Sequence, residues 1–215
     1  MKNRIRANDK GLTLIELLIA LVICAMVVAG IYRLFVAQSR AYTVQDSVVE
    51  VQQNIRSAME VMLRDLRMTA FDDDRTPLVN VAQPAFVPGD HSVTVRYEHE
   101  NAPYEVRYWL EGGTNLNRQE TRNGVSTTET ILENVEALNF TYGVDENEDG
   151  AMDDLNVLGV REDDWVSATT AGTLKVVSVR VSLTARPTQT SPDVQNVTPR
   201  TLVSAITFRN LSLMR

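Results

Sequence analysis

The sequence predicts an α+β fold in which a long N-terminal helix packs on a head of antiparallel β-sheet. An apolar run near the N-terminus leads into a segment whose apolar residues recur at three- and four-residue steps, as on one face of a helix. Beyond Pro77 the apolar period changes to two, the period of strands. The 215 residues allow one membrane helix and one domain, or at most two small ones.

The chain begins with a short basic leader, residues 1–11. Its four basic residues are Lys2, Arg4, Arg6 and Lys10. From Leu12 to Tyr32 only Thr13 and Glu16 are polar, and these 21 residues match the roughly 20 that a helix needs to cross a bilayer. We expect the membrane span to occupy residues 12–36. A carboxylate inside such a span is costly, so Glu16 needs a partner or a shallow position.

The stretch Gly11-Leu12-Thr13-Leu14-Ile15-Glu16, with its basic leader and apolar helix, resembles the N-terminus of type IV prepilins and of type II secretion pseudopilins. The resemblance implies that prepilin peptidase cuts after Gly11 and leaves Leu12 as a methylated N-terminus. It also implies that Glu16 pairs with the N-terminal amine of a neighbouring subunit. Leu12 departs from the family's usual phenylalanine but keeps a large apolar side chain.

Three other interpretations of this stretch remain open. Thr13 and Glu16 have the spacing of a capping box, in which the glutamate only starts a helix. A cleaved secretory signal peptide is the second, although its apolar core usually has only about 7–15 residues. The third is an uncleaved signal anchor, whose basic leader would keep the N-terminus in the cytoplasm.

Charge and cysteine content narrow the possible functions. The net charge is −7, and loss of residues 1–11 removes four basic residues and one acidic one, which brings it to −10. We expect no nucleic acid partner, because sequence-independent binding depends on lysine and arginine contacts to phosphates. The single cysteine, Cys24, excludes an intrachain disulfide.

We expect one helix over residues 12–70, about 90 Å long at 1.5 Å per residue. Its second half has one apolar face, formed by Val44, Val48, Val51, Ile55, Met59, Met62, Leu66 and Thr69. The charged residues between these positions, including Arg64 and Asp65, are predicted to lie off this face. An acidic cluster, residues 72–74, and Pro77 are expected to end the helix.

Residues 71–215 are predicted to form a mainly β head. Alternation predicts strands at residues 93–97 and 104–110, and Gly112-Gly113 favours a tight hairpin into a strand around Leu116. The remaining strands are expected at residues 135–142, 174–185 and 202–211, with a surface loop over residues 187–199.

Residues 135–142 and the closing Phe208-Arg209-Asn210 resemble minor pilins of the PilW type and the related J-type pseudopilin. With the N-terminus, this resemblance implies a type IV pilin-like fold. It implies a structural subunit, not an enzyme, that helps initiate or cap a type IV pilus or a type II secretion pseudopilus. The implied partners are other minor and major pilin subunits, prepilin peptidase and the inner membrane. The chain would cross that membrane once, with its N-terminus cytoplasmic and its head periplasmic.

Two functions from other classes compete with this one. The chain could be a signal-anchored periplasmic hydrolase that uses carboxylates of the head. It could also be an anchored binding protein that never polymerises. Neither alternative predicts cleavage after Gly11 or incorporation into a filament.

Residues 145–156 form an acidic loop with the ligand spacing of an EF-hand calcium loop. The residues at ligand positions one, three, five, seven and nine are Asp145, Asn147, Asp149, Ala151 (through its carbonyl) and Asp153. Gly150 stands at the sixth position, where the loop turns sharply. Asn156 replaces the bidentate glutamate of the twelfth position, so a calcium site here would be weak. The alternative is a solvated acidic turn.

Overall fold

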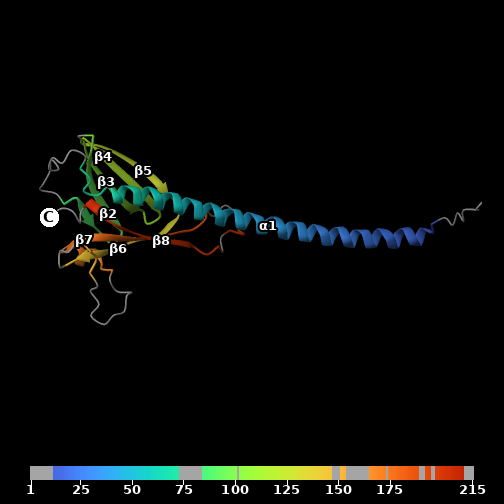
Figure 1. Cartoon of the computed structure of the whole chain (residues 1–215). Coiled ribbons are helices and arrows are strands. Elements are labelled where there is room, and N and C mark those ends of the chain that lie inside the picture. Colours follow the sequence, from blue (N-terminus) through green and yellow to red (C-terminus); the bar gives the residue numbers. More distant parts are fainter. Residues whose placement is uncertain are drawn as a thin grey trace, which may run out of the picture. The chain divides into compact units, whose positions relative to one another are not determined.

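The computed structural model divides the chain into two compact units, Met1–Gln45 and Asp46–Arg215. Figure 1 labels the helices and strands along the chain. The structure describes residues 12–72, 84–100, 102–146, 151–153, 165–172, 174–188, 192–194 and 197–210.

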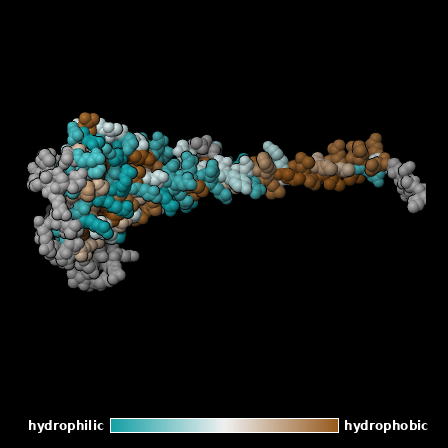
Figure 2. Space-filling model, turned by 45° about the horizontal axis from the view of Figure 1, so that its top comes forward, coloured by the Kyte–Doolittle hydropathy of each residue, from teal (hydrophilic) through white to brown (hydrophobic). Residues whose placement is uncertain are grey.

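Helix α1 spans Leu14–Arg67, 54 residues in all. Its apolar first part has no side chain buried within the chain, and among the described residues α1 is the one helix long and apolar enough to cross a membrane. On the face that Figure 2 shows, hydrophobic side chains (brown) gather over this part of the helix. Such an apolar surface needs a covering of lipid or protein.

The end of α1 comes three residues before the predicted Ala70. Residues 68–70 form a turn in which Ala70 takes a left-handed conformation (φ 58°) and donates its N–H to the Arg96 carbonyl at 2.9 Å. The Asn210 side chain donates to the Thr69 carbonyl at 3.1 Å, and this hydrogen bond links the segment after β8 to the turn that follows α1. Pro77, expected to help end the helix, lies outside the described residues.

The first sheet is antiparallel with the strand order β1-β2-β3-β4-β5. Its strands are β1 (Phe86–Pro88), β2 (Ser92–His99), β3 (Ala102–Glu111), β4 (Asn115–Arg122) and β5 (Val125–Leu132). Strands β2 and β3 confirm the predicted alternation. Strand β4 confirms the hairpin into a strand around Leu116, and Gly112 and Gly113 both have positive φ (61° and 76°).

Strand β5 was not predicted. It follows β4 through Asn123 and Gly124, which take φ values of 50° and 81°, as a two-residue hairpin requires. Most of β5 is exposed because it is an edge strand, so it lacks the alternation that marks a half-buried strand. The three-residue β1 was also not predicted.

The second sheet is antiparallel with the order β6-β7-β8. Its strands are β6 (Val135–Asp145), β7 (Lys175–Ala185) and β8 (Arg200–Thr207), and the short helix α2 (Ala168–Ala171) precedes β7. The prediction that the last strand reaches residue 211 is wrong. It ends at Thr207, after which the buried Phe208 still donates its N–H to the Val177 carbonyl at 2.7 Å and the backbone becomes helical at residues 209–210.

The core of the second unit joins both sheets to the apolar face of α1. Burial begins at Val51 and includes Ile55, Met59, Met62 and Leu66, which confirms this part of the predicted face. The face packs with the inward side chains of both sheets. Among them are Val95, Val106, Tyr108, Leu138, Phe140, Val181 and Phe208. The predicted α+β class is confirmed, with two antiparallel sheets.

Candidate functional site

The start of α1 holds Glu16 through hydrogen bonds with Thr13. The Thr13 N–H and hydroxyl both donate to Glu16 Oε2, at 2.9 and 2.8 Å. The Glu16 N–H donates to Thr13 Oγ1 at 3.4 Å. This is the reciprocal geometry of a capping box, one of the interpretations that the sequence allowed. Within the described residues, Glu16 Oε1 accepts no hydrogen bond, so one carboxylate oxygen stays open to a second partner.

The residues around Glu16 form an apolar, exposed surface. Leu12 is 81% exposed, and Leu14 and Ile15 are also exposed. A carboxylate on such a surface will be desolvated wherever lipid or a neighbouring subunit covers it, which makes a cationic partner valuable. Gly11, the predicted cleavage position, lies outside the described residues.

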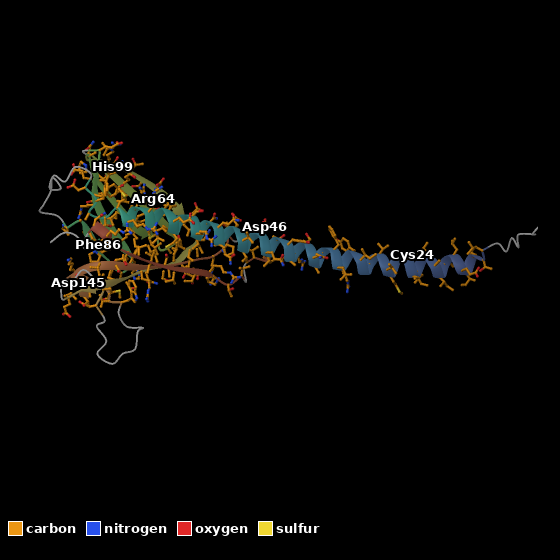
Figure 3. All side chains as sticks on the ribbon, viewed as in Figure 1. Cys24, Asp46, Arg64, Phe86, His99 and Asp145 are labelled. Atoms are coloured by element: carbon orange, nitrogen blue, oxygen red, sulfur yellow. The ribbon has the colours of Figure 1, made fainter. Side chains whose placement is uncertain are left out.

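Two predicted calcium ligands lie at the base of the acidic loop. Asp145 ends β6, is 1% exposed and lies 3.7 Å from Lys175 Nζ (Figure 3 labels Asp145). The Asp153 N–H donates to the Val144 carbonyl at 2.9 Å, and its carboxylate accepts the Glu146 N–H. The loop therefore closes back on the end of β6.

Of the other three proposed calcium ligands, the structure describes only one. Ala151 is described and exposed, whereas Asn147 and Asp149 lie outside the described residues. No group of acidic, histidine or cysteine side chains within the described ranges is arranged to hold a metal ion. Calcium binding by this loop stays a prediction.

Asp65 contradicts the prediction that it lies off the apolar face of the helix. It is 4% exposed, and its Oδ2 accepts hydrogen bonds from Arg118 Nε at 2.7 Å and from the Tyr108 hydroxyl at 2.6 Å. Arg118 also pairs with Glu120 at 2.6 Å and with Glu129 at 3.2 Å. A buried charge needs such partners, and they come from β3, β4 and β5, far away in the sequence.

Burial and the contacts of this cluster shift the pKa values of Tyr108 and Arg118. Burial, followed by the charge of Asp65, raises the pKa of Tyr108. Burial opposes the charge of Arg118, but hydrogen bonds to Asp65 and Glu120 outweigh it and raise the pKa of the guanidinium. Because Asp65 is buried and has two donors on one oxygen, we assign this cluster to the attachment of α1 to the first sheet.

An exposed apolar helix that starts at a capped glutamate, in one chain with antiparallel sheets, is consistent with a type IV pilin-like fold. Residues 6–32 match the family model described as the prokaryotic N-terminal methylation motif, and residues 104–209 match that described as type IV pilus-assembly protein W, PilW. The two matches support a type IV pilin-like protein of the PilW type, the family that its motifs resemble. Comparison with curated proteins and with solved structures gave no match.

The two family matches cover different parts of the chain. The methylation motif includes Gly11, Leu12 and Glu16, and together with the apolar helix it fits a membrane-anchored pilin. The PilW match runs from β3 to just beyond β8, and thus includes Arg118 and the whole second sheet. Families of pilins are structural, and association with other pilus components follows from the PilW match.

Proposed function

We propose that this chain is a minor pilin that helps initiate or cap a type IV pilus or a type II secretion pseudopilus and has no catalytic role. The observation that carries the proposal is the open oxygen of Glu16 at the start of an exposed apolar helix. A helix of this kind can leave the bilayer only when other apolar helices replace the lipid around it. Glu16 then needs a positive charge from a neighbour.

Processing would supply that charge. Prepilin peptidase would cut after Gly11, and the freed amine of Leu12, once methylated, would meet Glu16 of an adjacent subunit. The basic leader would keep the N-terminus in the cytoplasm before cleavage, with the second unit in the periplasm. The partners are then other minor and major pilin subunits.

N-terminal sequencing of the protein recovered from membranes and from sheared filaments tests this function. We expect the mature chain to begin at Leu12 and to carry a methyl group. Gly11→Val should block cleavage, because a β-branched side chain restricts access to the bond that follows, and should leave the full-length chain in the membrane. A mature wild-type chain with another first residue would remove the basis of the proposal.

Deletion of the gene addresses the role in initiation. A subunit that starts or caps filaments should lower the number of filaments per cell when it is lost, and the wild-type gene should restore that number. An anchored binding protein or a hydrolase would leave the filament number unchanged and would stay in the membrane fraction.

A further inference from the structure

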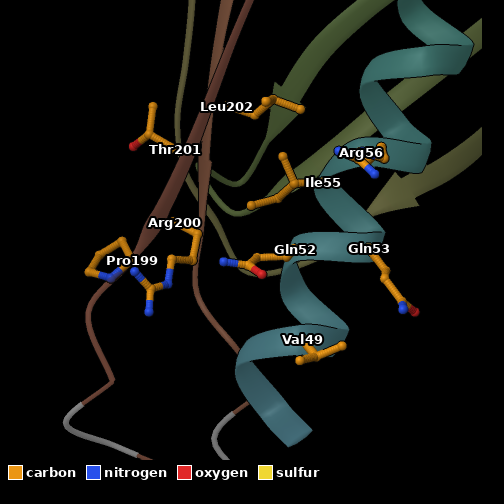
Figure 4. A pocket seen from close by; sticks show the side chains of 9 residues that line it. All are labelled: Val49, Gln52, Gln53, Ile55, Arg56, Pro199, Arg200, Thr201 and Leu202. Atoms are coloured by element: carbon orange, nitrogen blue, oxygen red, sulfur yellow. The ribbon is translucent and has the colours of Figure 1, made fainter. Parts of the chain in front are cut away.

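A groove of about 560 Å³ lies between α1 and the start of β8, within the second unit. In Figure 4, Gln52 points from α1 toward β8, and the Arg200 side chain extends from β8 with its guanidinium near Pro199. Ile55 and Leu202 form an apolar part of the lining, and Arg56 lines the groove from α1. We call this the Arg200 groove.

Most arginines on or beside the strands have an aromatic or a charged partner, and Arg107 and Arg180 lie over the rings of Trp109 and Trp165. Arg96, Arg118 and Arg186 each form an ion pair with a carboxylate. Arg200 Nε is buried without a hydrogen-bond partner. In the described part of the chain, no carboxylate lies within ion-pair distance of Arg200 or Arg56. Both guanidinium groups thus lack an ion-pair partner among the described residues, although carboxylates outnumber basic residues in the chain, whose net charge is −7.

We propose that the Arg200 groove binds the carboxylate of an aspartate or glutamate side chain on a neighbouring pilin subunit. A guanidinium presents paired N–H donors that match the two oxygens of a carboxylate. The Gln52 amide offers a further donor from the opposite wall, and Ile55 and Leu202 can contact the aliphatic stem of the incoming side chain. Because Arg200 Nε makes no hydrogen bond in its own chain, rotation of the guanidinium toward the ligand breaks none.

A neighbouring subunit is the source that the charges favour. The groove is open to solvent and offers positive charge on an otherwise acidic protein, so an acidic protein surface complements it. Residues of α1 form one wall of the groove, and in the proposed function subunits assemble through this helix. The inference thus rests on that function and names one contact within it.

The scarcity of lysine permits a direct test in the full-length protein. Lys175 is the only lysine after the predicted cleavage position. Arg200→Lys places an amine in the groove, and a carbodiimide then joins this amine to any carboxylate in contact with it. We expect a new crosslink from position 200 to an aspartate or glutamate of another pilin subunit in the sheared filament fraction. Arg107→Lys, at an exposed position of β3, is the matched control and should give no such crosslink.

Recovery of the subunit with its partners gives a second measurement. Arg200→Gln should reduce recovery with companion subunits by about tenfold, the loss expected for one charge-assisted contact, while Arg107→Gln should not. Unchanged melting temperatures would show that both variants are folded.

Each other outcome overturns the inference. A crosslink from position 200 to the chain's own carboxylates or to a second copy of this chain would assign the groove a different partner. Equal crosslinking in the Arg107→Lys control would show non-specific contact. If the wild-type chain enters filaments but no crosslink forms, the groove proposal alone fails. If the wild-type chain is never recovered with pilin subunits, the proposed function fails as well.

Discussion

At the start of α1, the two oxygens of Glu16 differ in their surroundings. Oε2 accepts both hydrogen bonds from Thr13, whereas Oε1 accepts none from the described residues. A capping role and an assembly role therefore need not compete, because different oxygens can serve them. Side-chain substitutions that remove one role at a time can separate the two.

Thr13→Val removes the capping hydroxyl and keeps the charge of Glu16, whereas Glu16→Gln keeps an oxygen for the Thr13 N–H and removes the charge. We expect Thr13→Val to cost about 1 kcal/mol of helix stability and to leave filament incorporation close to wild type. Glu16→Gln should be inserted and cleaved normally but incorporated poorly, because no charge remains to meet the neighbour's amine. Immunoblots of sheared filaments and of membranes measure both steps. Equal incorporation of Glu16→Gln and wild type would reduce Glu16 to a helix cap.

Among the elements, α1 and the first sheet are joined by a buried ion pair as well as by apolar contacts. Asp65 lies on the buried face of the helix and meets Arg118 of β4 and Tyr108 of β3. Such a pair contributes little net stability over a well-packed apolar replacement, but removal of one partner leaves a buried charge without compensation.

Asp65→Leu should therefore lower the free energy of unfolding by about 3–5 kcal/mol. For a chain of this size, that corresponds to a fall in melting temperature of about 6–20 °C. Adding Arg118→Met should recover most of the loss, since it removes the guanidinium that has lost its buried partner and leaves only the more exposed carboxylates of Glu120 and Glu129. Thermal melts of the full chain in detergent, followed by near-ultraviolet circular dichroism, measure both effects. Additive losses in the double variant would contradict a coupled pair.

The acidic loop is the second element that makes a prediction. With a Kd of about 10⁻⁴–10⁻³ M, millimolar calcium would stabilise the protein by about 0.4–1.4 kcal/mol. Calcium should then raise the melting temperature by about 1–6 °C relative to chelator. Asp149→Ala should abolish that difference, and Glu133→Ala, an exposed carboxylate outside the loop, should preserve it. Asp145 already lies near Lys175, and identical melts with and without calcium would show that the loop binds no calcium.

On the scale of the whole molecule, three buried tyrosines link stability to alkaline pH. Burial, followed by the charges of Asp65 and Glu120, raises the pKa of Tyr97 to about 12. Burial likewise raises the pKa of Tyr108 and of Tyr142. In the unfolded chain a tyrosine ionises near pH 10. The stability that these protonated tyrosines provide is therefore complete below about pH 10 and is lost as the pH rises toward 12.

We expect the melting temperature to be constant between about pH 8 and 9.5 and to fall steeply between about pH 10 and 12. Absorbance at the tyrosinate band should rise together with unfolding. Tyr97→Phe should make the fall shallower, because it removes one of the groups that ionise on unfolding. Ionisation of all tyrosines without loss of structure would contradict the assignment.

Much of the fold follows from periodicity along the sequence. The apolar steps of three and four predict α1 and its face from Val51 onward, and the alternation around Val95 and Val106 predicts the central strands. Strand β5 escaped because an exposed edge strand has no buried side to create alternation, although Asn123-Gly124 is a hairpin signal that could have revealed it. Sequence periodicity also gives no indication that the strands divide into two sheets.

The candidate functional residues likewise fall into some that the sequence predicts and some that it does not. The Gly11 to Glu16 motif is local, so a single stretch of sequence identifies it. The burial of Asp65 depends on Arg118, 53 positions away, and no local pattern shows that a charged residue on a helix will meet such a partner. The Arg200 groove likewise brings together residues of α1 and β8, and its unpaired guanidinium becomes visible only in three dimensions.

The link between Asp65 and Arg118 also has a mechanical consequence. In the filament that we propose, tension would load the subunit along its helix, and with Cys24 as its only cysteine this chain has no intrachain disulfide to bear that load. Hydrogen bonds fail over a short displacement, whereas apolar surfaces can slide and remain in contact. The Asp65 pair would therefore set the force at which α1 begins to slip past the sheet. Once slipped, an unpaired carboxylate among apolar side chains would favour return of the helix to its original register when the load is released.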